Sequence, residues 1–144
     1  MTTSTTTIPA TADPVTRPTV SVRGWLRIEA AAAFIAGLAL YGALGGAWPL
    51  VLPLLIVPDV SAIGYLRGPR LGAVTYNVVH NWAFGLGVLG AGLALGSSAV
   101  ALAGAILIAH VGMDRALGYG LKLPTSFGDT HLGRIGKDRG AAQS

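Results

Sequence analysis

The sequence predicts an all-α, polytopic membrane protein, a four-helix transmembrane bundle with both termini in the cytoplasm. Of its 144 residues, 52% are hydrophobic and 11% charged, and the mean hydropathy is +0.62. A soluble domain usually has about a quarter charged residues, so this composition indicates a bilayer environment. Four apolar segments are each long enough to cross a membrane, and all ten Lys and Arg residues fall outside their centres.

The N-terminal part divides into a tail and a first span. Residues 1–20 are rich in Thr, contain scattered Pro and almost no large apolar side chain, and are expected to be a disordered tail. The transmembrane domain is expected over residues 21–119. Its first span, residues 25–44, would form about 30 Å of helix, which is enough to cross the hydrocarbon. Trp25 and Tyr41 lie near its ends, where interfacial aromatic residues are common.

The second span, residues 48–66, contains two prolines. Pro53 and Pro58 each remove a backbone donor, so the sequence predicts a kinked or locally unwound helix. Asp59 follows Pro58 directly, and a break at this position can aim its carboxylate at a cavity, although a proline kink that serves packing alone is equally common. The short loop 67–70 then reverses the chain.

The third span, residues 71–95, has a polar first half and a Gly-rich second half. Tyr76, Asn77 and His80 are separated by three or four residues and would share a helix face, with Asn81 next to them. Glycines four residues apart allow helices to approach closely. Because similar Gly and Ala faces occur in the first span, a homo-oligomer through these faces is a further expectation.

The fourth span, residues 99–117, carries a histidine and an aspartate in an apolar context. His110 and Asp114 are four residues apart and would lie on one helix face. Ionisable groups at membrane depth are costly and usually functional. The following segment, residues 120–144, is too interrupted by Gly and Pro to be a fifth span, and is expected to be a cytoplasmic tail with a loop or short amphipathic piece at the membrane surface.

The basic residues predict the orientation. They precede the first span, separate the second and third, and follow the fourth, so an even number of spans places all of them on one side. The positive-inside rule then puts both termini in the cytoplasm, in a multi-pass protein of the cell (inner or plasma) membrane. This topology accounts for the net charge of +4 without nucleic acid. The absence of cysteine excludes disulfides and thiolate metal sites.

Four ionisable residues converge in depth. Counting about 1.5 Å of rise per residue from the basic residues, we expect Asp59, His80, His110 and Asp114 to fall in the cytoplasmic half of the bilayer. The outer half contains no ionisable residue. These positions predict a shared polar pocket that opens towards the cytoplasm, with Glu29 at its mouth.

Two imidazoles and two carboxylates favour a divalent metal, zinc before others, because their nitrogens and oxygens are good ligands and the two negative charges balance the ion. A bound metal would also activate water. Tyr76, Asn77 and Asn81 would then orient ligands or substrate. Two other interpretations stay open: structural polar packing between helices, and a proton or solute pathway.

With these residues in view, the run from Arg27 to Gly136 resembles the domain of unknown function 4260 family of small bacterial membrane proteins. That resemblance implies a multi-span membrane architecture and no established activity. It is carried by five motifs: Pro58-Asp59; Gly64-Tyr65-Leu66 with Gly68-Pro69-Arg70; Tyr76-Asn77 with His80; His110 with Asp114-Arg115-Ala116-Leu117-Gly118-Tyr119-Gly120-Leu121-Lys122; and Asp129-Thr130-His131-Leu132-Gly133.

The order Asp, His, then His-x-x-x-Asp is also similar to the zinc-site pattern of zinc-dependent phospholipase C and of membrane-bound metal-dependent hydrolases. This likeness implies one metal held by the four residues and a hydrolase acting on a phosphoester or lipid headgroup near the membrane surface. Four protein ligands fill the coordination positions of tetrahedral zinc and leave none for the attacking water. A water could bind only if the coordination number rose or if a second ion bound near Glu29, Asp129 or His131. The alternative is a non-catalytic helix bundle, acting as a membrane partner or an oligomeric conduit, and whether the protein is an enzyme stays undecided.

Overall fold

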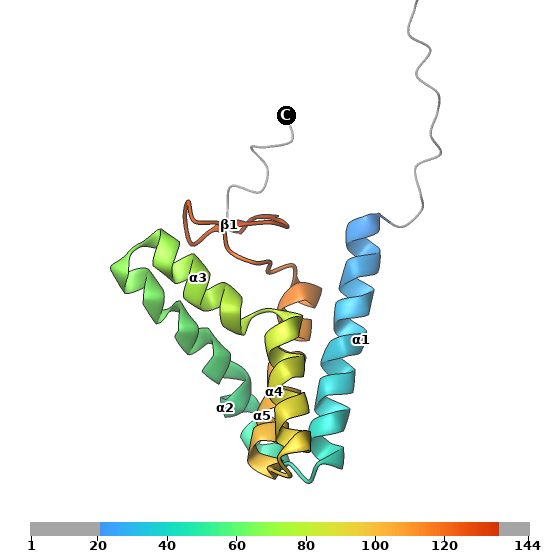
Figure 1. Ribbon diagram of the computed structural model, residues 1–144. Helices are drawn as coiled ribbons and strands as arrows, with labels where there is room; N and C mark the ends of the chain where they lie inside the picture. The colour runs from blue at the N-terminus through green and yellow to red at the C-terminus, as the bar shows by residue number, and fades with distance from the viewer. Residues whose placement is uncertain (1–20, 136–144) are drawn as a thin grey trace, which may run out of the picture.

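The computed structural model describes residues 21–135, which are mostly helical (Figure 1). The tail expected over residues 1–20, and the last part of the C-terminal tail, lie outside the described residues. In chain order the elements are α1 (Val22–Ala43), η1 (Trp48–Leu50), α2 (Val51–Ile56), η2 (Val57–Arg67), α3 (Pro69–Val79), α4 (Trp82–Ala94), α5 (Ser98–Leu117), β1 (Asp129–Thr130) and β2 (Gly133–Arg134).

Three helical stretches are long and apolar enough to cross a membrane: Val22–Ala43, Trp48–Arg67 and Ser98–Leu117. Many large apolar side chains lie on the outside of the fold, among them Leu52, which is 76% exposed. Apolar exposure on this scale is unusual for a soluble monomer and suits contact with lipid. These features are those of a membrane protein.

The third expected span is two helices rather than one. α3 ends at Val79 and α4 begins at Trp82, with His80 and Asn81 between them. The Asn81 side chain accepts a hydrogen bond from the Phe84 backbone amide at 2.9 Å, which caps α4 and replaces the bond that a continuous helix would make. His80 and Asn81, two of the polar residues in the expected third span, therefore lie at the end of one helix and the start of the next.

The second stretch unwinds as its prolines predicted. α2 is a single short α-helix, and from Val57 the chain continues in the tighter 3-10 geometry of η2. η2 and α3 pack against each other and form an arm that is inclined to the α1–α4–α5 group (Figure 1). Their approach depends on Gly72, which lies against the Tyr65 ring.

α5 is the central helix, with α1 and α4 packed closely against it. A Cβ added to Gly37 of α1 would lie 2.6 Å from the Ala109 backbone nitrogen, and one added to Gly112 of α5 would lie 2.5 Å from the Phe34 backbone nitrogen. These positions require glycine, because a larger residue would collide with backbone atoms of the facing helix, which cannot move aside as a side chain can. These two glycines therefore serve packing within the chain, and the expected homo-oligomer stays a prediction.

The segment after α5 is folded more than the sequence indicated. Gly118, with a φ of 93°, ends α5 in the left-handed conformation. β1 and β2 then form a small antiparallel hairpin, in which Asp129 is opposite Arg134. The hairpin lies at the same end of the molecule as the start of α1 and the η2–α3 junction (Figure 1). All Lys and Arg residues described by the structure belong to these segments, to the last turn of α5 or, for Lys122, to the chain that joins α5 to the hairpin.

Candidate metal centre

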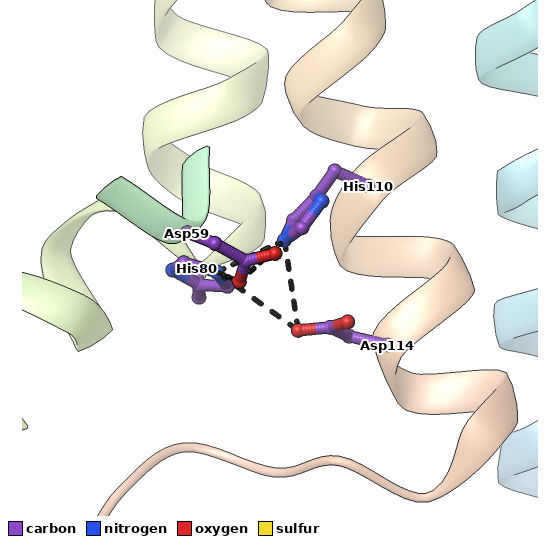
Figure 2. A group of neighbouring side chains, drawn as sticks. All are labelled: Asp59, His80, His110 and Asp114. Carbon is purple, nitrogen blue, oxygen red and sulfur yellow. Dashed lines mark hydrogen bonds and ion pairs between the residues drawn. The ribbon is translucent and has the colours of Figure 1, made fainter. Parts of the chain in front are cut away.

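The four residues proposed as ligands meet at one point (Figure 2). Asp59 comes from η2, His80 from the break between α3 and α4, and His110 and Asp114 from adjacent turns of α5. Each offers one ligand atom, and these four atoms all lie within 4.8 Å of one another. The predicted convergence of three helical segments is confirmed.

The cluster has the dimensions of a metal site. The two Nε2 atoms of His80 and His110 are 2.9 Å apart. The four distances from these nitrogens to the nearest oxygens of Asp59 and Asp114 range from 3.4 to 3.9 Å. Ligand atoms at about 2.0–2.1 Å from a tetrahedral ion are about 3.3–3.4 Å from one another. Small movements of the side chains would therefore suffice to hold such an ion.

Both imidazoles present a lone pair to the centre. His80 Nδ1 lies 2.9 Å from the Tyr76 carbonyl oxygen, and His110 Nδ1 lies 2.6 Å from that of Leu55. A carbonyl only accepts, so each Nδ1 carries a proton, and in a neutral imidazole the lone pair is then on Nε2. Two bare nitrogens that face each other at 2.9 Å repel unless a proton or a cation lies between them. Carbonyl-bonded Nδ1 atoms are typical of histidines that bind metal through Nε2.

The local sequence explains these orientations. In a 3-10 turn the Leu55 carbonyl would accept from the amide of residue 58, but Pro58 has none. The Leu55 oxygen thus turns to His110. On the side of His80, α3 ends at Val79. The His80 ring can then turn back so that its Nδ1 contacts the Tyr76 carbonyl oxygen, one helical turn earlier in the chain.

The centre is buried on one side and open on the other. His110 is 0% exposed and His80 is 3% exposed, whereas the side chain of Asp59 is 54% exposed. Tyr76 donates its hydroxyl proton to Asp114 Oδ2 at 2.9 Å and stacks its ring on His80, with centroids 3.5 Å apart. Tyr76 therefore contacts two of the candidate ligands, and the cluster is open beside Asp59.

The two asparagines act on the backbone instead of the centre. Asn77 accepts from the Lys122 amide at 2.7 Å and donates to the Lys122 carbonyl at 2.9 Å, so it attaches the C-terminal segment to α3. Asn81 donates to the carbonyls of Asn77 and Val78 and caps α4. Their role is to hold the elements that carry the ligands.

Glu29, Asp129 and His131 are not brought to the centre. Glu29 is exposed on α1, and Asp129 pairs with Arg134 at 3.0 Å in the hairpin. Hydrogen bonds from Thr125 and Ser126 hold the pKa of Asp129 below its usual value. His131 accepts from the Leu121 amide through Nδ1. Within residues 21–135 no second group of three or more potential ligands forms, so a second ion near these three residues would have no such group to hold it.

Lys122 is a buried cation beside the centre that does not stand out in the sequence. Lys122 is 5% exposed, and its ammonium donates to the Phe127 carbonyl and lies 5.2 Å from the centre of the Tyr76 ring. Burial lowers the pKa of Lys122, and the carboxylates of Asp114 and Asp59 oppose that shift. Its context, Leu-Lys-Leu, is equally typical of a lysine whose ammonium reaches the membrane surface, so the sequence offers no discriminating signal.

Removing the Asn77 side chain should detach the C-terminal segment. Asn77→Ala deletes two hydrogen bonds to Lys122, and we expect a loss of about 1–3 kcal/mol in the local opening free energy of that segment. Hydrogen exchange of the amides from Leu121 to Ile135 measures it. Val78→Ala truncates the next, half-exposed residue of α3 and is the control. Equal protection in both variants would contradict this role of Asn77.

The family comparison covers nearly all of the described chain. The model of the domain of unknown function DUF4260 matches residues 23–135, a range that includes all four ligands and the hairpin. The chain belongs to this family. No curated protein and no solved structure matches the chain. The predicted family membership is therefore confirmed, and the description of the family assigns no activity to the centre.

Proposed function

We propose that this protein is a membrane-embedded protein that binds one divalent transition-metal ion, zinc before others, through Asp59, His80, His110 and Asp114. The observation that carries this proposal is the pair of bare Nε2 atoms that face each other at 2.9 Å, each fixed by a carbonyl at its Nδ1. Two carboxylates balance the charge of a +2 ion, and mixed nitrogen and oxygen ligands suit zinc.

The proposed orientation places the centre near the cytoplasmic face of the cell membrane. The start of α1, the η2–α3 junction and the hairpin lie at one end of the molecule and carry the basic residues, which the positive-inside rule assigns to the cytoplasm. Both termini would then be cytoplasmic, and the third pass would consist of α3 and α4 in sequence.

The surroundings of the centre favour hydrolysis of a phosphoester or lipid headgroup as its reaction. When bound, a divalent ion supplies Lewis acidity and lowers the pKa of a coordinated water to about 7. Lys122, whose ammonium lies 5.2 Å from the centre of the Tyr76 ring, provides positive charge for an anionic group. Tyr76 keeps Asp114 oriented, and the exposed Asp59 lies on the side that a substrate would approach.

A non-catalytic role is the second candidate, and one observation favours it. Four protein ligands fill a tetrahedral site, as in structural zinc sites. The ion would then join η2, α5 and the α3–α4 break, the three segments that meet at the cluster. Oligomerisation through α4 is compatible with this role, because Gly87 and Gly90 have no described side chain over them.

Metal content tests the proposal. Detergent-purified protein, stripped with a chelator, reloaded with Zn²⁺ and passed through a desalting column, is expected to retain about one Zn²⁺ per chain by elemental analysis. A folded protein that retains no ion would refute metal binding. Cleavage of bis(p-nitrophenyl) phosphate that requires the ion would support the hydrolase, and a bound ion without cleavage would leave the structural role.

A further inference from the structure

A second polar region lies beside the last turn of α5. There the structure has a cavity of about 850 Å³ between the start of α1, the end of α5 and the hairpin. The metal centre faces away from α1, with α5 between them (Figure 2). The volume is within the range of about 300–1,000 Å³ that is usual for small-molecule sites.

Arginines dominate the lining of this cavity. They are Arg23 and Arg27 of α1, Arg115 of α5 and Arg134 of β2, while Glu29 is the one carboxylate among the lining residues. Within residues 21–135, Arg134 pairs with Asp129, but Arg23, Arg27 and Arg115 form no ion pair with a carboxylate. Three guanidinium groups against one lining carboxylate, Glu29, leave the cavity positive.

The hydrogen bonds of Arg27 and Arg115 leave guanidinium donors available. Arg27 donates from Nη2 to the Leu117 carbonyl at 3.4 Å. Arg115 donates to the His80 carbonyl and has Nη1 3.2 Å from the His131 ring. A guanidinium has five N–H donors in a planar fork that matches phosphate oxygens. Leu26 and Trp82 add apolar surface to the same cavity.

We infer that this cavity binds the phosphate of a net-anionic headgroup, with Arg23, Arg27 and Arg115 as its donors. The inference rests on the proposed membrane orientation, which places the cavity at headgroup level, but it does not require the metal. A monoanionic phosphate diester such as phosphatidylglycerol fits the surplus positive charge, and Leu26 and Trp82 suit the start of its acyl chains. A zwitterionic headgroup brings its own cation towards the arginines and fits less well.

Isothermal titration with short-chain lipids below their micelle concentration tests this inference. Full-length protein in neutral detergent is expected to bind dihexanoylphosphatidylglycerol at least about tenfold more tightly than dihexanoylphosphatidylcholine. The binding constant for phosphatidylglycerol should fall as salt is raised. In a third titration, inorganic phosphate that binds as tightly as the lipid would assign the same site to a soluble phosphate, and much weaker binding would assign it to the lipid.

Two double variants locate the site. R23Q/R27Q should weaken phosphatidylglycerol binding about tenfold or more, whereas R67Q/R70Q removes the same charge from the η2–α3 junction and should leave binding within about twofold. Equal affinity for the two lipids, or equal losses in the two double variants, would overturn the inference. The Zn²⁺ content of R23Q/R27Q should stay at the wild-type value, so that failure of the headgroup site and failure of the metal centre are distinguishable.

Discussion

His110→Ala is expected to reduce the bound Zn²⁺ from about one ion per chain to background. The substitution removes one of two imidazole ligands and leaves Nε2 of His80, which lay 2.9 Å from the lost nitrogen, with only carboxylates opposite. Because His110 is completely buried, no nearby solvent-exposed group can take its place. Elemental analysis of the reloaded, desalted variant measures the loss.

Two companion variants separate ligation from folding. Asp114→Asn keeps the shape of the side chain and should weaken Zn²⁺ binding by at least about tenfold, because an amide is a poorer ligand than a carboxylate. His131→Ala removes a histidine of the hairpin that lies outside the cluster, and should retain the ion. Circular dichroism shows whether each variant keeps its helices. A folded His110→Ala protein with wild-type metal content would refute the assigned centre.

Gly112→Ala is expected to lower the stability of the bundle by about 1–3 kcal/mol. The new Cβ would lie 2.5 Å from the Phe34 nitrogen and 2.8 Å from the Ala30 oxygen, so α1 and α5 must separate. Gly112 lies midway between His110 and Asp114 on α5, and a shift there also moves two ligands. Thermal unfolding in detergent and the Zn²⁺ content should therefore fall together.

Gly90→Ala is the matched control for Gly112→Ala. Gly90 is also inside an apolar helix, but no atom lies within 4 Å of an added Cβ. Alanine should raise the stability slightly there, by up to about 1 kcal/mol, because it favours helix more than glycine does. A similar melting temperature for the two variants would show that close α1–α5 packing does not limit stability.

The apolar segments and the four candidate ligands can be identified from the sequence because their signals are local. Hydropathy over about twenty residues identifies a span whatever it packs against, and Asp59, His80, His110 and Asp114 stood out because ionisable groups are rare at such depth. The unwinding at Pro58 was predictable for the same reason, since the missing N–H is a property of one residue.

The break at His80 and Asn81 was not predictable from the same apolar pattern. A side-chain amide in a membrane segment can form a hydrogen bond to a neighbouring helix, or it can cap the start of a new helix. The same sequence is compatible with both arrangements. Lys122 was missed because its ammonium finds the Phe127 carbonyl and the Tyr76 ring only after the segment folds back on α3. Glu29 was placed at the mouth of the metal pocket, but it lines the arginine cavity instead.

By itself, the sequence determined the membrane class, the family and the identity of the four candidate ligands, since these depend on residue type and short spacing. Only the tertiary structure decided that both Nε2 atoms face one point, because that direction depends on the carbonyls of Leu55 and Tyr76. It also decided that the arginines of α1, α5 and the hairpin surround a separate cavity. Contacts between segments far apart in the chain produce both sites, and no local pattern encodes them.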